Sequence, residues 1–294
     1  MKIAFIILTY NEEMHIKRCL ESIKPYANEI YLIDSFSEDQ TVEIAKLYDV
    51  EILQNKFVNQ SEQLNWALSN INPSSEWIFR IDADEYLPSN YSLDKDLIIS
   101  NISSVNGIYV KRNMVFQGKK IRFGGVFPIY VLRLFRFGFG VGESRWMDEH
   151  IIVSDGKTIK SNINIVDENL NSLDFWISKH NNYSSREAVE ILNDEFHFIS
   201  RNKDAHKNPG IRTFIKNKFY LITPLYIRST ILFFVRYIIF LGFLDGIKGF
   251  LFHFLQAYWY RLLVDAKVLE VKSFMKKNNV DVKQAIKECL HLEL

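Results

Sequence analysis

The stretch KIAFIILTYNEEMHIKRCLESIKPYANEIYLID, residues 2–34, predicts the fold of the N-terminal half of the chain. Its apolar start, residues 2–9, is typical of a buried parallel strand. Asn11 is the expected N-cap of a helix that carries two acidic residues in its first turn and ends at Pro25. Residues 29–34 are a second apolar run. Strand, helix and strand in this order predict two parallel strands joined by a crossover.

The alternation continues beyond this stretch. Further strands are expected over residues 50–54 and 77–81, with helices over 41–48 and 61–71 and Ser61 as the cap of the second helix. Four strands that alternate with helices predict an α/β fold with a mainly parallel central sheet and helices on both faces.

Polar side chains follow each of the four predicted strands at the point where it ends. They are Thr9, Tyr10 and Asn11; Asp34 and Ser35; Gln54 and Asn55; and Asp82, Ala83, Asp84 and Glu85. Ligands of parallel α/β sheets bind outside the carboxyl ends of the strands. Any single group is explained equally well by a polar loop or a helix cap, but the four together predict a binding edge.

Asp82 and Asp84 are the most informative pair at this edge. Two carboxylates that are two residues apart at a strand end can reach one hard divalent cation and leave positions open for phosphate oxygens. Neither a GxGxxG after the first strand nor a GxxxxGK[ST] motif occurs in the sequence. The pattern therefore predicts a Mg²⁺ or Mn²⁺ site for a phosphorylated ligand, with a solvated acidic loop as the alternative.

Composition excludes several classes of protein. The 294 residues are 48% hydrophobic and 24% charged, with a net charge of +1 and two cysteines. This balance is that of a folded protein, and the low net charge argues against a nucleic-acid partner. Two cysteines near opposite ends, with no histidine cluster beside them, argue against a disulfide scaffold and a zinc finger.

An ordered set of motifs resembles glycosyltransferase family 2. The motifs are TYNEE at 9–13, DSFSEDQT at 34–41, QLNWAL at 63–68 and DADE at 82–85. The resemblance extends to GG at 124–125, RLFR at 133–136, WMDEH at 146–150 and LGFLDG at 241–246. It is strongest to bacterial enzymes that build lipopolysaccharide core, O-antigen or capsule, and it implies a GT-A fold, a nucleotide-sugar donor, Mn²⁺ or Mg²⁺, and inversion at the anomeric carbon.

The resemblance also implies roles for individual residues. The implied donor-binding residues are Thr9, Tyr10, Asn11, Glu12, Asp34, Asn65, Asp82, Ala83, Asp84, Arg133 and Arg136. The implied metal ligands are Asp84 and Asp82. His150 would be a third ligand, a group that orients the base, or a structural histidine.

An inverting transfer needs a base for the acceptor hydroxyl proton. Glu149 is the preferred candidate and Asp148 the second. Arg145 and Trp146 would flank the acceptor sugar, with a core position as the alternative for Trp146.

Residues 211–264 differ from the rest of the chain, because they are rich in aromatic residues and carry seven Lys or Arg against a single Asp. An apolar stretch at 225–244 is interrupted by Arg228 and Arg236, which argues against a transmembrane helix. It predicts a helix that lies in the membrane interface, with both arginines at lipid phosphates and Phe233, Phe234, Ile238 and Ile239 among the acyl chains. A buried helical hairpin or a homo-oligomer interface is the alternative.

The predicted organisation is a GT-A catalytic domain over residues 1–200, a linker over 201–210 and a helical membrane-associating region over 211–294. The donor half would cover about 1–100 and the acceptor half about 101–200, ending in one long helix. The expected function is transfer of a sugar to a lipid-linked glycan at the cytoplasmic face of the cytoplasmic membrane, as a peripheral protein. Transfer to polyprenyl phosphate and non-catalytic binding of a nucleotide or carbohydrate are the alternatives.

Overall fold

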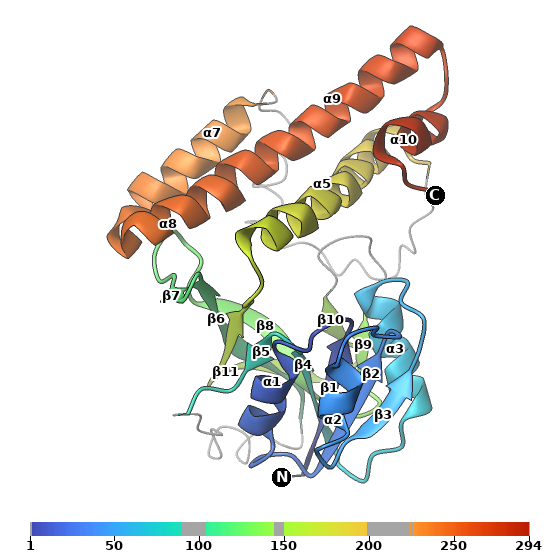
Figure 1. The fold of residues 1–294 in the computed structure, drawn as a ribbon, viewed down its shortest axis with the longest axis vertical. Helices are drawn as coiled ribbons and strands as arrows, with labels where there is room; N and C mark the ends of the chain where they lie inside the picture. Colours follow the sequence, from blue (N-terminus) through green and yellow to red (C-terminus); the bar gives the residue numbers. More distant parts are fainter. Residues whose placement is uncertain (1, 90–103, 144–149, 199–223, 225, 294) are drawn as a thin grey trace. The chain divides into compact units, whose positions relative to one another are not determined.

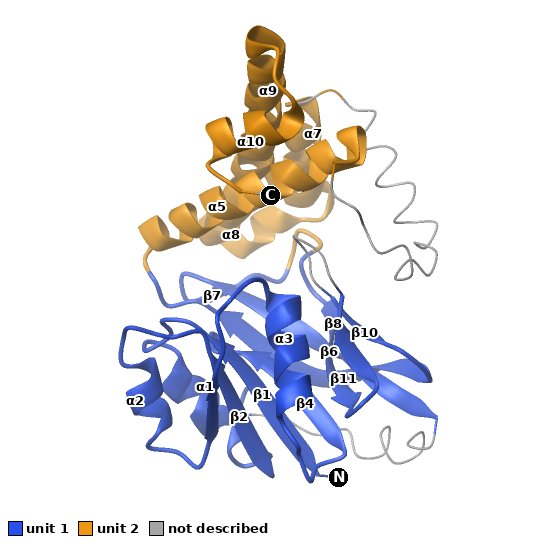
Figure 2. Ribbon diagram, turned by 90° about the vertical axis from the view of Figure 1, so that its right-hand side faces the viewer, with its two compact units in different colours: residues 1–122, 126–171 blue, residues 123–125, 172–294 orange. Residues whose placement is uncertain are grey.

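The computed structural model describes residues 2–89, 104–143, 150–198, 224 and 226–293 (Figure 1). These residues form two compact units (Figure 2). The first, which we call the sheet unit, comprises Met1–Arg122 and Val126–Asn171. The second, which we call the helical unit, comprises Phe123–Gly125 and Ser172–Leu294.

A nine-stranded sheet is the centre of the sheet unit, within the described residues. Its first half consists of β1 (Ile3–Thr9), β2 (Glu29–Asp34), β3 (Glu51–Gln54) and β4 (Trp77–Asp82), in the order β3-β2-β1-β4. All neighbours in this half are parallel, as the sequence predicts. The structure therefore confirms the α/β class and the four N-terminal strands.

The second half of the sheet is mixed. It contains β5 (Glu85–Tyr86), β6 (Val105–Phe116), β7 (Lys119–Lys120), β8 (Ile129–Arg136) and β11 (Lys157–Glu168). β8 is antiparallel to both β4 and β6, whereas β6 and β11 are parallel. The expectation of a mainly parallel sheet thus holds for the first half only. A separate antiparallel pair, β9 (Gly140–Gly142) and β10 (Ile151–Val153), lies off this sheet.

Alternate residues of β1 build the two faces of the sheet. Ile3, Phe5 and Ile7 pack in one apolar cluster with α1 (Ile16–Ile23), and Ala4 and Ile6 pack in another with α3 (Gln60–Asn70). The short α2 (Thr41–Ala45) adds Ala45 to the first cluster. Because successive side chains of a strand point to opposite faces, an unbroken apolar run covers both layers.

Two predicted helix caps are wrong. α1 begins at Ile16, and Asn11 lies before it with a positive φ of 54°, where its side chain accepts a hydrogen bond from the Glu38 amide. Asparagine tolerates this left-handed conformation better than most residues. The N-cap of α3 is Asn59, and the Ser61 hydroxyl donates instead to the carbonyl of Glu143.

The helical unit begins earlier than the predicted boundary at residue 200. The long helix expected before that boundary is confirmed as α5 (Leu173–Phe196), but its buried residues pack against α9 (Tyr260–Asn278) and α10 (Val282–Leu290). The division therefore falls after Asn171. The predicted linker, residues 201–210, lies outside the described residues.

Between α5 and α9 the described residues of the helical unit form five short helical segments. They are α7 (Ile227–Phe234), η2 (Val235–Ile239), η3 (Gly242–Asp245), α8 (Gly246–His253) and η4 (Phe254–Trp259). No single described helix is long and apolar enough to cross a membrane. Ile227–Ile239 and Gly242–Asn278 pass that test only as a pair, with a bend of 70° between them.

Part of the aromatic density is internal to the helical unit. Phe233 lies against five neighbouring rings, among them Phe250 and Phe254 at centroid distances of 6.1 Å each, so its packing is not that of an acyl-chain anchor. Arg228 forms a buried ion pair with Asp265 and does not face lipid. Of the two arginines predicted to reach lipid phosphates, Arg236 alone stays a candidate.

Candidate functional site

The sheet reverses its strand order at β1, because β2 and β3 lie on one side of this strand and β4 on the other. Ligands of open α/β sheets bind at such a reversal, outside the carboxyl ends of the strands. The register places Thr9 opposite Asp34 and Leu8 opposite Asp82. Residues 9–13, 34–41 and 82–85 therefore meet along one margin, which we call the strand-end edge.

Asp34 is the buried centre of this edge. Its carboxylate accepts hydrogen bonds from the hydroxyls of Thr9 at 3.2 Å and Ser37 at 2.5 Å, the Ser37 amide at 3.0 Å and the Gln54 side chain at 3.0 Å. Its side chain is fully buried. Asp34 and Thr9 therefore support the edge from within, and neither offers a free group to a donor.

Hydrogen bonds between side chains and backbone join the two loops that follow β1 and β2. The Asn11 amide bonds to the Ser37 hydroxyl, and the Glu12 amide bonds to the Thr41 hydroxyl at 2.7 Å. Glu13 adds two more links, from its amide to Asp39 and from the Gln40 amide to its carboxylate. These reciprocal bonds give the two loops a fixed arrangement without a ligand.

Two aromatic rings stand out from these loops. Tyr10 is 55% exposed and Phe36 is 53% exposed. Phe36 also has a positive φ of 61°, which is unfavourable for a bulky residue with a β-carbon. Strained backbone and an exposed apolar ring at one position indicate a functional role. Nothing in the sequence distinguishes Phe36 beyond its place in a strand-end loop.

Asp82 belongs to a buried network of charges at the end of β4. One carboxylate oxygen lies 2.5 Å from Arg80 and the other 2.9 Å from Arg133. Arg133 also donates to Glu85 at 2.6 Å, and the Asp82 amide donates to the same carboxylate. Burial raises the pKa of Glu85, and the neighbouring Asp82 carboxylate raises it further. Arg133 thus offsets the negative charge of the Asp82 and Glu85 side chains.

Asp84 stands outside this network. Its carboxylate accepts one hydrogen bond, from the Asn169 amide group at 3.2 Å, while its backbone carbonyl accepts from Arg18. Ala83 between the two acids is buried in the apolar core. Of the two acids of the DxD motif, Asp84 therefore keeps more of its carboxylate free for a ligand.

The donor chemistry of Asp84 fits a hard divalent cation, which commonly takes one or two protein carboxylates and completes its shell with phosphates and water. Asp82 would have to exchange an arginine for the ion. Within the described part of the chain, no group of three His, Cys, Asp or Glu side chains is placed to hold a metal. The expected set of Asp82, Asp84 and His150 is therefore not assembled.

Two implied donor-binding residues lie away from the edge. The Asn65 side chain exchanges two hydrogen bonds with the backbone of Gly142 and so joins α3 to β9. Arg136 pairs with Glu76 and lies opposite Trp77, the first residue of β4. Because β8 runs antiparallel to β4, the last residues of β8 lie beside the first residues of β4, away from the strand-end edge.

Glu12 has a partner that sequence reasoning missed. His15 is fully buried, and its Nε2 accepts a hydrogen bond from the Leu170 amide at 2.8 Å. Its Nδ1 therefore carries the proton and donates to Glu12 at 2.5 Å. Arg18 makes a parallel link to Glu168 at 2.7 Å. Both contacts join α1 to the segment after β11, which positions Asn169 beside Asp84.

The residues implied in acceptor binding and base catalysis lie outside the described part of the chain. They are Arg145, Trp146, Asp148 and Glu149. His150 is described and exposed, and it precedes β10.

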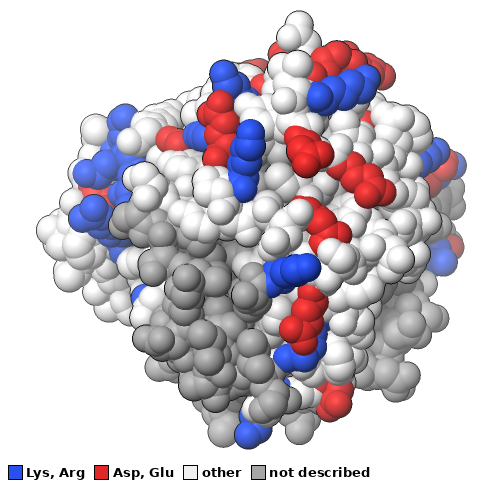
Figure 3. Space-filling model, turned by 90° about the horizontal axis from the view of Figure 1, so that it is seen from below, with Lys and Arg blue, Asp and Glu red and all other residues white. Residues whose placement is uncertain are grey.

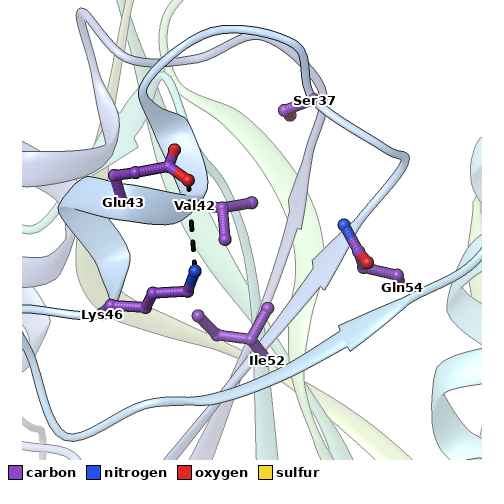
Figure 4. A pocket seen from close by; sticks show the side chains of 6 residues that line it. All are labelled: Ser37, Val42, Glu43, Lys46, Ile52 and Gln54. Atoms are coloured by element: carbon purple, nitrogen blue, oxygen red, sulfur yellow. Dashed lines mark ion pairs between the residues drawn. The ribbon is translucent and has the colours of Figure 1, made fainter.

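A hollow of about 450 Å³ lies beside α2 and the end of β3, lined by Ser37, Val42, Glu43, Lys46, Ile52 and Gln54 (Figure 4). Figure 4 shows the Glu43–Lys46 ion pair on the helix side of the hollow and Gln54 on the strand side. Gln54 thus connects the hollow to Asp34. On the face that Figure 3 shows, acidic and basic side chains of the described residues are interspersed, as the low net charge predicts.

Residues 4–95 match the family model "Glycosyl transferase family 2". Over 82 residues the chain is 45% identical to the SPbeta prophage-derived glycosyltransferase SunS of Bacillus subtilis, a match that covers 26% of this chain and 19% of SunS. It is 35% identical over 86 residues to an uncharacterized glycosyltransferase of Rickettsia typhi, covering 29% of each protein. The chain thus spans less than a third of the length of these relatives.

Solved structures give weaker similarities. S. aureus TarS aligns with 99% of this chain and 91% of its own at 18% identity and a TM-score of 0.41. Glucosyl-3-phosphoglycerate synthase from Mycobacterium tuberculosis, in complex with Mn²⁺ and UDP-glucose, aligns with 38% of this chain and 44% of its own at 19% identity and a TM-score of 0.31. Neither carries an argument about function. The matched segment contains β1 to β4 and the whole strand-end edge, so the similarity to glycosyltransferase family 2 lies in the part of the chain that carries this edge.

Proposed function

We propose that this chain transfers a sugar from a nucleoside diphosphate donor to a lipid-linked glycan, with inversion at the anomeric carbon, during assembly of a bacterial surface polysaccharide. The observation that carries the proposal is the position of Asp84. This carboxylate follows β4 at the point where the strand order reverses, and it lies outside the ion pairs that hold Asp82.

The strand-end edge supports binding of a nucleotide donor. The exposed rings of Tyr10 and Phe36 offer flat apolar faces to a nucleobase. Asp84 would hold Mn²⁺ or Mg²⁺, and the ion when bound offsets the negative charge of the diphosphate. Thr9 and Asp34 keep the two loops in place for this contact.

The transfer needs a base that takes the proton of the acceptor hydroxyl while its oxygen bonds to the anomeric carbon and the nucleoside diphosphate departs. We assign this role to Glu149, with Asp148 as the alternative, and we assign acceptor binding to Arg145 and Trp146. These assignments rest on the WMDEH motif at 146–150.

The lipid-linked acceptor is supported by the surface of the helical unit. Fourteen large apolar side chains of this unit between residues 226 and 254 are exposed: Tyr226, Ile227, Ile231, Phe234, Ile238, Ile239, Phe240, Leu241, Phe243, Leu244, Ile247, Phe250, Leu251 and Phe254. Large exposed apolar surfaces indicate contact with a membrane or another protein. We propose that this surface attaches the protein peripherally to the cytoplasmic face of the cytoplasmic membrane.

An Asp84→Asn variant tests the role of Asp84 in the donor site. Calorimetry with a panel of nucleotide sugars, with Mn²⁺ or with a chelator, should show metal-dependent binding of one donor by the unmodified chain and its loss in Asp84→Asn. Hydrolysis of that donor should fall by about 100-fold or more. Glu38→Gln is the matched control, because it removes one exposed carboxylate from the same edge.

Three outcomes separate the proposal from its alternatives. Unchanged metal-dependent binding in Asp84→Asn would remove Asp84 from the donor site. Donor binding without any hydrolysis or transfer would favour a non-catalytic binding protein. Transfer to polyprenyl phosphate in place of a lipid-linked glycan would favour a polyprenyl-phosphate sugar transferase.

A further inference from the structure

Arg236 has no acidic partner among the residues that the structure describes. It lies in the π-helical segment η2 and is partly buried, and its side chain makes no hydrogen bond or ion pair within the described residues. Two other arginines of the helical unit are compensated, since Arg228 pairs with Asp265 and Arg261 pairs with Glu187. A partly buried charge without a partner is unfavourable for stability, so Arg236 calls for a ligand.

His253 adds a second uncompensated group at the same place. Its imidazole is fully buried, and neither ring nitrogen has a hydrogen-bond partner among the described residues. The ring is held between two glycines, because a β-carbon at Gly124 would lie 2.0 Å from it and one at Gly242 would lie 2.6 Å from it. Buried polar groups in folded proteins are almost always hydrogen-bonded, so this ring is an exception that needs an explanation.

Arg236 and His253 are electrostatic neighbours. Burial lowers the pKa of His253 and the charge of Arg236 lowers it further; burial likewise lowers the pKa of Arg236, and the charge of Arg261 adds to that shift. Asp245, the acidic group that acts on His253, already accepts a hydrogen bond from the Phe123 amide at 2.9 Å. The local field is therefore positive, and it favours an anion.

The backbone at this place is also unusual. Arg236 lies in one π-helical segment and His253 directly precedes another, η4. π-Helical turns are rare and are frequent at functional sites. Ile238, Ile239 and Phe240, which follow Arg236 in the chain, are each at least half exposed. The positive group is thus adjacent to apolar surface, which is the chemistry that complements a lipid with a phosphate headgroup.

We propose that Arg236 binds the phosphate of an anionic phospholipid headgroup, while the exposed apolar side chains between residues 226 and 254 contact the acyl chains. Binding at Arg236 adds a specific headgroup contact to the general attraction between the protein and a membrane surface. The inference rests on the membrane attachment proposed above and specifies the residue through which it acts.

The experiment is a vesicle-binding titration of the full chain. The vesicles consist of phosphatidylcholine alone or of phosphatidylcholine mixed with phosphatidylglycerol. Arg236→Gln is compared with Lys248→Gln, which removes the same charge from the same segment. One generic basic residue near an anionic bilayer contributes about fivefold to binding, so Lys248→Gln should weaken it by about that factor or less. Arg236→Gln should weaken it by about 20-fold or more, and Arg236→Lys should restore part of the loss.

A spectroscopic readout accompanies the titration. An anion at Arg236 neutralises the charge that lowers the pKa of His253, so the imidazole NMR signals should titrate at higher pH with phosphatidylglycerol vesicles than without them. Circular dichroism of each variant establishes that it is folded.

Three results would overturn the inference: equal weakening by Arg236→Gln and Lys248→Gln, equal binding of the unmodified chain to both vesicle types, and no binding to either. Donor hydrolysis by the unmodified chain, measured without vesicles, reports on the proposed transferase separately. The proposed lipid site and the proposed transferase activity can therefore fail independently of each other.

Discussion

Arg133 in the sheet unit and Arg236 in the helical unit are both withdrawn from water, yet only Arg133 has acidic partners among the described residues. The same contrast holds for the polar groups around them. The strand-end edge compensates its buried Asp34 with four hydrogen bonds, whereas within the described part of the chain neither ring nitrogen of His253 has one. The apolar surface follows the same division, because long runs of exposed apolar side chains occur in the helical unit.

The strand-end edge is therefore formed before its ligand binds, whereas the surface around Arg236 receives its missing counter-charge from a ligand. At the strand-end edge, the loops after β1 and β2 are bonded to each other, so a donor meets a fixed arrangement. Around Arg236 the missing counter-charge must come from outside the described residues. Substitutions should therefore damage stability in the first region and binding in the second.

The largest effect on stability is expected from Arg133→Met. This change leaves Glu85, which is 1% exposed, without the arginine that donates to it and removes one arginine partner of Asp82. Removal of one partner of a buried pair costs about 3–5 kcal/mol. Urea unfolding at neutral pH measures the loss.

Arg236→Met is the matched comparison for that change. Because Arg236 has no partner in the described part of the chain, its removal orphans no acid and should leave the free energy of unfolding within about 1 kcal/mol of the original or raise it. A larger loss at Arg236 than at Arg133 would reverse the contrast between the two units.

The next effect is a pH dependence that comes from His253. Burial and the Arg236 charge, against Asp245, lower the pKa of His253 from its ordinary value of 6.5 to about 4. The unfolded chain therefore binds a proton between these values that the folded chain does not. Stability should be complete above pH 6.5 and should fall as the pH decreases toward 4, by about 3 kcal/mol in all.

His253→Gln isolates this contribution from that of other titrating groups. The difference in unfolding free energy between the unmodified chain and the variant should shrink as the pH is lowered through this window. The quantity to compare is how this difference changes with pH. The altered packing of residue 253 against Gly124 and Gly242 affects stability equally at every pH, so it does not contribute to that change. Parallel pH profiles would show that His253 titrates normally.

The fold of the sheet unit follows from local sequence to a large extent. The apolar runs at β1, β2 and β4 and the polar residues after them identify four strands and their common edge. Local sequence could not show which of these polar groups already has an ion-pair or hydrogen-bond partner within the protein. Asp82 and Asp84 look equivalent in the DADE motif, but Arg80 from the same strand and Arg133 from β8 pair with Asp82 and not with Asp84.

Longer-range pairing explains the other misplacements. Arg136 is close to Arg133 in sequence, but the antiparallel course of β8 carries it to the far end of β4. Ser61 and Asn65 look like a cap and a ligand group, yet both bond to the Gly142–Glu143 backbone about eighty residues away. In the helical unit, Tyr260 belongs to the aromatic-rich segment 211–264 that the sequence assigns to the membrane interface, but it is buried and donates to Glu187.

A smaller loss of stability is expected from Asp34→Asn. The variant keeps the shape of the side chain but replaces one carboxylate oxygen with an NH₂ group, which donates. In one orientation this group faces the Ser37 amide and the Gln54 side chain, and in the other it faces the hydroxyls of Thr9 and Ser37. An unsatisfied buried donor costs about 1–3 kcal/mol, and we expect a loss of about 2 kcal/mol in thermal or urea unfolding. Glu38→Gln should change stability by less than about 0.5 kcal/mol, since its side chain is exposed. Equal effects of the two variants would show that Asp34 does not organise the edge.

The smallest effect, and one of opposite sign, is expected from Phe36→Gly. Phe36 holds a φ of 61° with its ring 53% exposed, so the folded chain gains little packing from the ring and bears the strain of a left-handed backbone. Glycine relieves that strain but is more flexible in the unfolded chain, so the net change should be a gain of up to about 1 kcal/mol in unfolding free energy. If the ring stacks on the nucleobase, the same variant should bind the nucleotide donor about tenfold more weakly, because base–aromatic stacking contributes about 1–3 kcal/mol. Calorimetry and thermal unfolding of one preparation measure both quantities. A stable variant with unchanged donor affinity would show that the strained ring at the strand-end edge does not contact the donor.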